Sequence, residues 1–443
     1  MNKITFSMNT FYKCFSLFTL ICVSAGAYAQ GESEFQPRTI NPSHPACVYY
    51  AGEYTGRSSV PVSSDIANRM SRGATACTTI NVNYSGFDAF PEAQAAFQYA
   101  VDIWAMSIES PQQITVSASF ADLSPGTLGS AGANGYTTLN PATAPGAIAD
   151  TFYNISLAEK LSNSNINGTF GIEILAQFNN DTSEIPWYFG TDANPPSGQF
   201  DFVSVVLHEL GHGLGFAGFG SVDTQSGIGD IRDSGSGFAS IYDTFIENGT
   251  ANPILSFPDP STELGSELTG NNLFCVGPIA TGQNGNIAPR IFAPNSWNQG
   301  SSYSHWNEST FLAGDINSLM TPQIGPGEAN HNPGPITLGF FEDMGWSICG
   351  GTLTVEDVSL ANVVVGPNPF KSSISVQLSN AYADEYQLDI IDINGRIITS
   401  ETQEAKAGEL TISNLDNLTE ALYFLKITNT TNGQSITKKV VKI

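Results

Sequence analysis

One segment of the chain carries the strongest structural signal, and it reads DFVSVVLHELGHGLGF over residues 201–216. Apolar residues surround nearly the whole of a helix drawn over Asp201–Leu214, which predicts a buried helix. Within it, His208-Glu209-Leu210-Gly211-His212 places two imidazoles four residues apart on one helix face. Both can reach one Zn²⁺ ion at about 2.0–2.1 Å. The alternative, a buried helix whose histidines are only hydrogen-bonded, leaves costly polar groups in the core.

The residues beside the two histidines fit the same chemistry. Glu209 points slightly aside, where it can hold a metal-bound water and accept its proton as general base. Gly215 can adopt a positive φ, so the chain can turn sharply out of the helix beneath the metal. A compact motif would continue with a third histidine three residues later, but that position is Gly218. The third ligand must therefore come from elsewhere.

Candidates for the third ligand are few. The chain has five histidines, and three lie outside the motif: His44, His305 and His331. Downstream of His305, the stretch from Ser318 to Pro322 has the form of a Met-turn, a tight turn that places Met320 under a metal site as an apolar floor. His305 and His331 both stay open at this point, and a carboxylate such as Asp243 or Glu247 is less favoured because Met320 fits the other pattern.

The order of these motifs resembles the leishmanolysin-like zinc metallopeptidases, metzincins in which a large insertion separates the helix from the third histidine. The resembling pieces are HELGHGLGF at 208–216, SHW at 304–306, LMTP at 319–322 and EDMGW at 342–346, which ends a helix expected over Thr337–Met344. The similarity covers roughly Asp201–Trp346 and weakens back to Pro91. The resemblance implies that His208, His212 and His305 bind zinc, that Glu209 is the general base and that Met320 is the Met-turn residue.

The residues before the motif predict a mixed α+β domain. Apolar residues at helical spacing after a proline favour a helix over Pro91–Ser107, and β-type patterns favour strands over Ile114–Phe120 and Gly171–Phe178. The second strand is interpreted either as an edge strand that pairs with an extended peptide substrate or as a plain core strand. The expected fold class is α+β, a metzincin-like zinc peptidase domain followed by an all-β, Ig-like sandwich.

The end of the chain has a different composition. Lysine, nearly absent from the middle of the chain, returns there, and six short segments alternate or run β-branched between turn residues, which predicts a β-sandwich: Ser373–Leu378, Tyr386–Ile391, Arg396–Ser400, Glu409–Ile412, Leu422–Thr428 and Ile436–Val441. This tail resembles the C-terminal sorting domain of type IX secretion, in GPNPF at 366–370, DINGR at 392–396 and KKVVK at 438–442. The resemblance implies transport across an outer membrane by that machinery; a generic ligand-binding sandwich is the alternative.

The beginning of the chain has the pattern of a secretory signal peptide. Lys3 and Lys13 precede a short apolar run that ends in Ala27-Tyr28-Ala29. The run falls short of the ~20 residues of a membrane span, so we expect an exported mature chain without a transmembrane segment. We also expect this chain to be a monomer. The expected domains are a signal peptide at 1–29, a metallopeptidase domain at 30–350, a linker at 351–362 and a sorting domain at 363–443.

Four of the six cysteines lie beyond the signal peptide: Cys47, Cys77, Cys275 and Cys349. An even number in an exported chain predicts two disulfides. Sequence order favours Cys47–Cys77 and Cys275–Cys349, since each pair closes a local loop. The competing hypothesis is a free thiol that caps the metal in a latent precursor.

The chain is strongly acidic, with Lys+Arg 16, Asp+Glu 41 and a formal net charge of -25, which argues against nucleic acid as a partner. Carboxylates in the loops of the middle domain could bind Ca²⁺ or could form a solvated acidic surface: Asp181, Glu184, Asp192, Asp230, Asp233, Asp243 and Glu247.

Together these features predict a secreted zinc endopeptidase in which Glu209 takes a proton from a metal-activated water as it attacks the scissile carbonyl of a protein or peptide. A catalytically inactive, zincin-fold binding protein at the cell surface is the alternative, and the intact Glu209 argues against it. A structural zinc would need a fourth protein ligand. No further Cys or His pair in the chain has suitable spacing.

Overall fold

The computed structural model describes residues 37–443 except 41–46, 53–55, 168–170, 351–362, 379–384, 394, 406–407 and 431–434. The expected signal peptide and linker therefore lie outside the described residues. The helices before the linker are α1 Ser64–Ser71, α2 Pro91–Ala105, α3 Ile155–Ser162, α4 Phe202–Gly213, α5 Thr262–Leu268, α6 Pro278–Gln283 and α7 Pro335–Met344, with 3₁₀ turns η2 Tyr242–Phe245, η3 Ile254–Ser256 and η4 Ser318–Met320.

The strands before the linker are β1 Thr39–Ile40, β2 Tyr49–Ala51, β3 Ser58–Val60, β4 Ile80–Ser85, β5 Ile108–Glu109, β6 Ile114–Ala121, β7 Thr127–Ala133, β8 Tyr136–Thr138, β9 Thr151–Asn154, β10 Ile174–Asn179, β11 Trp187–Tyr188, β12 Phe200–Asp201, β13 Ser221–Asp223, β14 Ile228–Asp230, β15 Ala239–Ser240, β16 Ile246–Asn248, β17 Leu273–Cys275, β18 Gln323–Ile324, β19 Glu328–Asn330 and β20 Ser347–Ile348. After the linker come β21 Val364–Gly366, β22 Ile374–Gln377, β23 Glu385–Ile391, β24 Ile397–Glu404, β25 Glu409–Ile412, β26 Leu422–Asn429 and β27 Ser435–Val441.

A six-stranded sheet with the order β18-β2-β7-β10-β6-β4 lies at the centre of the domain before the linker. β4, β6 and β10 run parallel, whereas β7 runs antiparallel to β10. β2 pairs antiparallel with β7 and parallel with β18. The hypothesis of an edge strand at Gly171–Phe178 is therefore wrong, because β7 and β6 occupy both sides of β10, which is a core strand.

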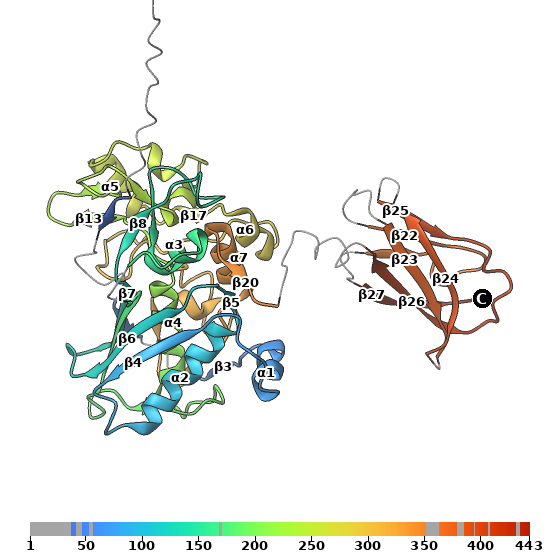
Figure 1. Cartoon of the computed structure of the whole chain (residues 1–443), viewed down its shortest axis with the longest axis horizontal. Coiled ribbons are helices and arrows are strands. Elements are labelled where there is room, and N and C mark those ends of the chain that lie inside the picture. Colours follow the sequence, from blue (N-terminus) through green and yellow to red (C-terminus); the bar gives the residue numbers. More distant parts are fainter. Residues whose placement is uncertain are drawn as a thin grey trace, which may run out of the picture. The chain divides into compact units, whose positions relative to one another are not determined.

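Two helices pack against this sheet and against each other (Figure 1). α2 begins at Pro91, whose missing N–H costs nothing in the first turn, and buries Ala96, Ala100 and Trp104 at four-residue spacing. All residues of α4 are buried, as the apolar pattern on all its sides predicts. The Trp104 indole donates to the Leu207 carbonyl at 3.0 Å, which fixes α2 against α4.

The disulfide in the described residues joins Cys77 to Cys349, so the pairing expected from sequence order is wrong. β5 pairs antiparallel with β20. The Cys77 and Cys349 amides donate to the Ala105 and Ser107 carbonyls at 3.0 and 2.9 Å, which brings the two cysteines together from opposite ends of the domain. Cys47 and Cys275 are free and buried.

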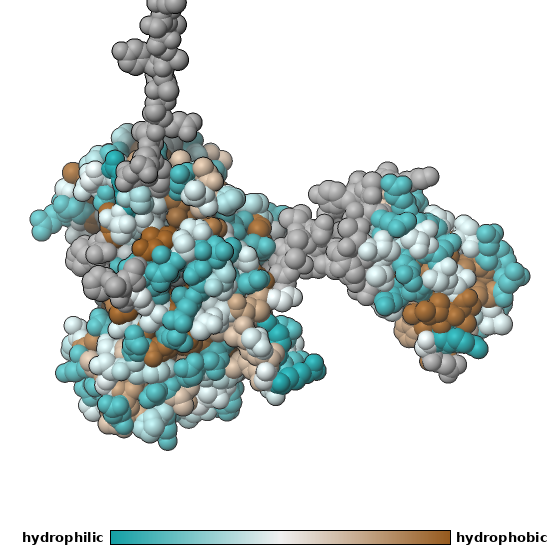
Figure 2. Space-filling model, viewed as in Figure 1, coloured by the Kyte–Doolittle hydropathy of each residue, from teal (hydrophilic) through white to brown (hydrophobic). Residues whose placement is uncertain are grey.

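The described residues after the linker form two antiparallel sheets, β21-β22-β25 and β24-β23-β26-β27. Both sheets contribute to one apolar core, for example through Ile374 and Val376 from the first and Leu388 and Leu425 from the second. The sandwich predicted from alternating segments is confirmed, with strand ends shifted by a few residues. Figure 2 shows a hydrophobic patch on this part of the chain. Among the residues after the linker, Ile393, Ile397 and Ile398 have exposed side chains.

None of the helices in the described part of the chain combines the length and the apolar character needed to cross a membrane.

Candidate metal centre

Three histidines converge on one point inside the domain. His208 and His212 lie one turn apart on α4, and His305 arrives from the loop that precedes η4. The Nε2 atoms are 3.0 Å apart for His208 and His212, and 3.2 Å from each of these to His305. All three side chains are fully buried. The structure thus brings the three predicted zinc ligands together.

Backbone carbonyls fix the orientation of all three rings. The Nδ1–H of His208 donates to Leu319 O at 2.7 Å, that of His212 to Phe216 O at 2.7 Å and that of His305 to Ser301 O at 2.6 Å. A carbonyl only accepts, so Nδ1 carries the hydrogen and the Nε2 lone pairs face one another. Burial lowers the pKa of each ring, to about 4 for His212, so the rings are neutral. Three such acceptors repel unless a cation lies between them.

The spacing of the donors fits zinc. Zn–N bonds of 2.0–2.1 Å in a tetrahedral arrangement put ligand nitrogens about 3.3 Å apart. The observed 3.0–3.2 Å separations lie close to that value. Neutral imidazoles with carbonyl partners on Nδ1 are typical zinc ligands.

A fourth donor joins the group. The Cys47 Sγ lies 3.3 Å from His305 Nε2 and 3.6 Å from His208 Nε2, and the four donor atoms lie within 4.8 Å of one another. Burial and the nearby Glu209 raise the pKa of the Cys47 thiol, whereas a bound cation would favour the thiolate. The structure therefore places Cys47 as a free thiol beside the three histidines. This is the arrangement that the competing hypothesis from the sequence describes.

Glu209 lies beside this cluster in an energetically costly setting. Its side chain is fully buried, and neither carboxylate oxygen has a hydrogen bond of ordinary geometry. Burial raises the pKa of Glu209 well above its usual value, although the amides of Ala131 and Tyr49 and the Cys47 thiol oppose this shift. A buried carboxyl group without a hydrogen-bond partner lowers stability by a few kcal/mol, so Glu209 is not there to stabilise the fold.

The turn below the cluster is built as the Met-turn pattern predicts. Met320 ends η4, is fully buried and packs under α4, where a Cβ on Gly211 would lie 2.7 Å from its Sδ. Its neighbour Leu319 supplies the carbonyl that orients His208. Gly215 has φ +116°, and a Cβ there would lie 2.7 Å from Asn154 Oδ1, so the chain needs glycine to leave α4.

The alternative third ligands lie elsewhere. His331 bonds through Nε2 to Asp201 Oδ1 at 2.7 Å, and the same oxygen caps the start of α4 by accepting from the Ser204 amide at 2.8 Å. His331 thus supports the start of α4, the helix that carries His208 and His212, and its assignment as a ligand is wrong. Asp243 and Glu247 are also not members of the ligating group.

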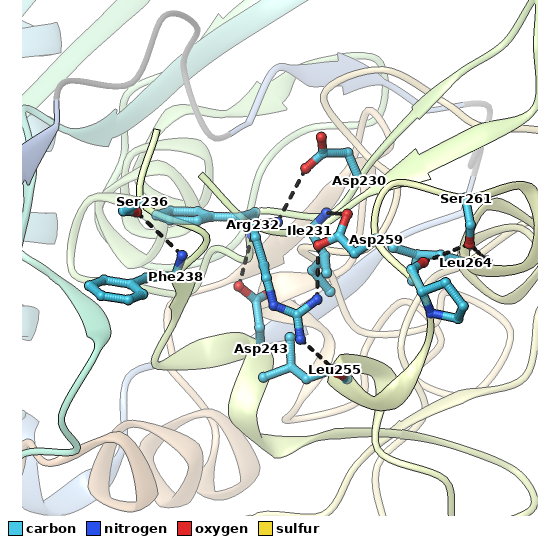
Figure 3. Close-up of polar contacts among 12 residues, drawn as sticks. Asp230, Ile231, Arg232, Ser236, Phe238, Asp243, Leu255, Asp259, Ser261 and Leu264 are labelled. Carbon is cyan, nitrogen blue, oxygen red and sulfur yellow. Dashed lines mark hydrogen bonds and ion pairs between the residues drawn. The ribbon is translucent and has the colours of Figure 1, made fainter. Parts of the chain in front are cut away.

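The acidic side chains of the loops form hydrogen bonds and ion pairs with neighbouring residues. Figure 3 shows Arg232 with Asp259, paired at 2.9 Å through Nη1, while Nη2 donates to the Leu255 carbonyl at 2.6 Å. Asp230 accepts from the Arg232 amide at 3.2 Å, and Asp233 accepts from Ser236. Within the described ranges, acidic side chains form no second group of three or more that could share an ion. A Ca²⁺ site in these loops therefore stays a prediction, and so does the alternative of a solvated acidic surface.

Comparison with known families identifies the end of the chain. Residues 364–443 match the family described as secretion system C-terminal sorting domain. The tail is therefore a type IX sorting domain, as its sequence motifs predicted, and the protein is exported to the cell surface or secreted. Residues 162–226, which include α4 and its two histidines, match a family described as SPBPB7E8-like.

Individual relatives match only parts of the chain. The ulvan lyase NLR42 of Nonlabens ulvanivorans is 28% identical over 96 residues, which are 22% of this chain and 17% of the lyase. The chain therefore spans less than a fifth of that relative.

Two solved structures are similar to segments of the chain at 18% identity each. A DUF3244 family protein with an immunoglobulin-like β-sandwich from Bacteroides vulgatus covers 18% of this chain and 83% of its own, with a TM-score of 0.16. PorZ, a surface component of the type IX secretion system of Porphyromonas gingivalis, covers 22% of this chain and 14% of its own, with a TM-score of 0.17. Likenesses at this level do not bear on the function of the chain.

Proposed function

We propose that this protein is an exported zinc endopeptidase of the metzincin class. One observation carries the proposal: three neutral imidazoles direct Nε2 at a common point, and the unpartnered carboxyl group of Glu209 lies beside that point. The buried Met320 under α4 and the resemblance to leishmanolysin-like peptidases support the same class. The lyase relative matches too small a part of the chain to favour a different activity.

The chain's own residues divide the chemistry between them. His208, His212 and His305 would hold the zinc ion, which polarises water and the scissile carbonyl as a Lewis acid. Glu209 accepts the proton of the attacking water and delivers it to the leaving amine. The carbonyl partners of the histidines keep the rings neutral and fixed, so that the Nε2 lone pairs need no rearrangement.

A structural zinc site is the second candidate, and Cys47 is the observation that favours it. Four protein donors close a zinc site, whereas a catalytic site keeps one position open. Two features favour a catalytic site that is closed only in this form of the chain. Glu209 has no role in a purely structural site, and Cys47 precedes β2, a short strand inserted between β7 and β18. Removing that strand would take the fourth donor away.

The test compares Cys47→Ser with the double variants Cys47→Ser/Glu209→Gln and Cys47→Ser/His305→Ala, for bound zinc and for hydrolysis of casein. Cys47→Ser is expected to keep one zinc and to hydrolyse casein. Adding Glu209→Gln should keep the zinc and reduce hydrolysis by at least ~10²-fold, and adding His305→Ala should lose both. A Cys47→Ser chain that stays folded but neither retains zinc nor hydrolyses casein would support the structural site instead.

A further inference from the structure

The backbone at Tyr303 adopts a conformation that tyrosine rarely takes. Its φ is +76°, in the left-handed region, and its side chain is fully buried. This region suits glycine and costs free energy for a residue with a Cβ, so it persists only where the surroundings enforce it. Strained residues of this kind cluster at functional sites, and Tyr303 lies two residues before His305.

The turn at Tyr303 brings the His305 ring back to the chain that precedes it. The Nδ1–H of His305 donates to Ser301 O, four residues earlier, at 2.6 Å. In an extended chain, residues four apart lie about 13 Å from each other, so this contact requires a turn between them. The Tyr303 amide donates to Phe292 O at 2.7 Å, and the Phe292 amide donates to the His305 carbonyl at 2.8 Å. Phe292 therefore holds the backbone on both sides of Ser304.

Polar contacts hold every functional group of Tyr303. Its hydroxyl donates to Asp243 Oδ1 at 2.9 Å, and its carbonyl accepts from the Tyr242 hydroxyl at 2.8 Å. Tyr242 and Asp243 both belong to η2, so one short element fixes the ring and the backbone of Tyr303 together. With the amide bound to Phe292, the three polar groups of Tyr303 all have partners in the strained conformation.

Two glycines after α4 make room for the Tyr303 ring. A Cβ on Gly220 would lie 2.6 Å from Tyr303 Cδ1, and the three atoms nearest to it all belong to this ring. A Cβ on Gly218 would overlap both the ring and the Asp243 carboxylate. The Gly218 amide also donates to Ser304 Oγ at 3.2 Å. The Tyr303 ring thus takes the space at the position where a compact motif carries its third histidine.

We propose that Tyr303 is a positioning residue for His305: its strained backbone, held by η2 and accommodated by the glycines after α4, directs the third imidazole to the point shared with the other two. This inference rests on the zinc site of the proposed function and names a residue that acts on that site through His305. If the contacts of Tyr303 are lost, the backbone relaxes towards the extended region and the His305 ring turns away. Replacing a residue that orients a metal ligand weakens metal binding about 10- to 100-fold.

Substitutions at residue 303 separate the strain from the packing. The zinc affinity of the full chain is measured by competition with a chelating dye, with Cys47→Ser in every variant so that the thiol cannot compensate for a displaced His305. Tyr303→Phe, which loses the hydroxyl bound to Asp243, should weaken zinc binding ~10-fold, and Tyr303→Ala should weaken it further. Tyr303→Gly loses the same ring but tolerates a positive φ, so it should bind zinc ~10-fold more tightly than Tyr303→Ala. A ring that only fills the core predicts no such recovery, because glycine leaves the larger cavity.

A second measurement keeps the tyrosine in place. Gly220→Ala puts a methyl group against the Tyr303 ring and should weaken zinc binding ~10-fold. In the Tyr303→Ala chain the same substitution should add almost nothing, because the ring that it meets is gone.

Two matched controls record what a change of stability alone does to zinc binding. Gly282→Ala adds a Cβ that has nothing within 4 Å. Tyr153→Phe removes a buried hydroxyl that accepts from the Ile148 amide at 2.8 Å, away from the segment around His305. Both controls should leave the zinc affinity unchanged, while urea unfolding of each variant records any loss of stability.

The outcomes separate this inference from the proposed function. Equal zinc affinities for Tyr303→Gly and Tyr303→Ala, or an unchanged affinity for Gly220→Ala, would overturn the positioning role. Zinc binding that weakens as much in the two controls would overturn it as well, because the affinity would then follow stability alone. If the zinc affinities follow the expected order but the Cys47→Ser chain hydrolyses no casein, the positioning role stands and the peptidase function fails.

Discussion

At the scale of single residues, the sulfur atom of Cys47 decides between two forms of the candidate metal centre. With this sulfur the site has four protein donors, and without it the site has three histidines and an open position. Cys47 completes a four-donor set with His208, His212 and His305, and Glu209 lies beside this set without a hydrogen bond of ordinary geometry. In the proposed zinc site, the three histidines would hold the ion, and the Cys47 thiol would occupy the position that a substrate has to reach. The state of Cys47 is therefore the first property of the site to measure.

Cobalt substitution tests whether the thiol coordinates the ion. Co²⁺ bound by a thiolate absorbs in the near ultraviolet through sulfur-to-metal charge transfer, whereas Co²⁺ bound only by imidazoles does not. We expect the cobalt-loaded chain to show this band and the Cys47→Ser chain to lack it while binding one Co²⁺. Cys275→Ser is the matched control, because Cys275 is also free and buried but lies outside the ligand group. Loss of the band in both variants, or in neither, would contradict the assignment.

At the scale of structural elements, η2 connects the exit from α4 to the segment that carries His305. The Asp243 carboxylate in η2 accepts from the Phe219 amide at 3.1 Å and from the Tyr303 hydroxyl at 2.9 Å. Ser240 donates to the same carboxylate through its amide at 2.8 Å and its hydroxyl at 2.7 Å. Asp243 therefore holds together two chain segments that meet only after folding.

This carboxyl group makes stability depend on pH. Burial raises the pKa of Asp243 from 3.8 to about 6, although its hydrogen bonds act in the opposite direction. The folded chain then holds the proton more tightly than the unfolded chain, so the contribution to stability is full below pH 4 and falls as pH rises through 6. The loss amounts to roughly 3 kcal/mol.

Urea unfolding at pH 4.5 and 7 for wild type and Asp243→Asn measures this contribution. The variant lacks the titration, so its stability should fall less between the two pH values. The comparison uses the change in the free energy of unfolding between the two pH values rather than its absolute value. This removes the separate cost of the lost hydrogen bonds. Parallel pH profiles for the two proteins would show that Asp243 keeps an ordinary pKa in the fold.

Elements with a local signal were predictable, and long-range pairings were not. The apolar pattern and the spacing of His208 and His212 lie within a dozen residues, so α4 and the shared face of its two histidines follow from the sequence. The same holds for the alternating strands of the tail. Cys77 and Cys349 are 272 residues apart. The β5–β20 ladder and the amide hydrogen bonds beside it bring them together. No local sequence pattern predicts such a long-range pairing.

The insertion of β2 between β7 and β18 could not be predicted either, because it is also a long-range pairing without a local sequence pattern. β7 reads TLGSAGA, with few large side chains, and β2 reads YYA over three residues. Neither sequence has a period strong enough to predict a strand. The position of Cys47 beside the histidines depends on that pairing, so the sequence could offer a metal-capping thiol only as a competing hypothesis.

At the scale of the whole molecule, two separate apolar cores correspond to two separable tasks. The core before the linker surrounds α2, α4 and α7, and the core of the tail is built from residues between Val363 and Val440. Because the described residues of these cores do not intermix, removing one should not expose the other to water. The proposed hydrolysis and the export can then be changed independently.

Deletion of residues 363–443 tests this independence in a cell that has type IX secretion. The truncated chain should fold, bind zinc and, after removal of the Cys47 segment, hydrolyse casein as the full chain does, because its core is complete. It should accumulate on the inner side of the outer membrane, because the sorting domain matched over residues 364–443 is missing.

The cells are fractionated, and bound zinc and casein hydrolysis are measured in each fraction, which checks both the location and the folding of the truncated chain. A fusion of residues 363–443 to a periplasmic reporter is the control and should reach the surface or the medium. Truncated protein in the medium of intact cells would show that export depends on another segment, and loss of zinc binding on truncation would show that the two cores are coupled.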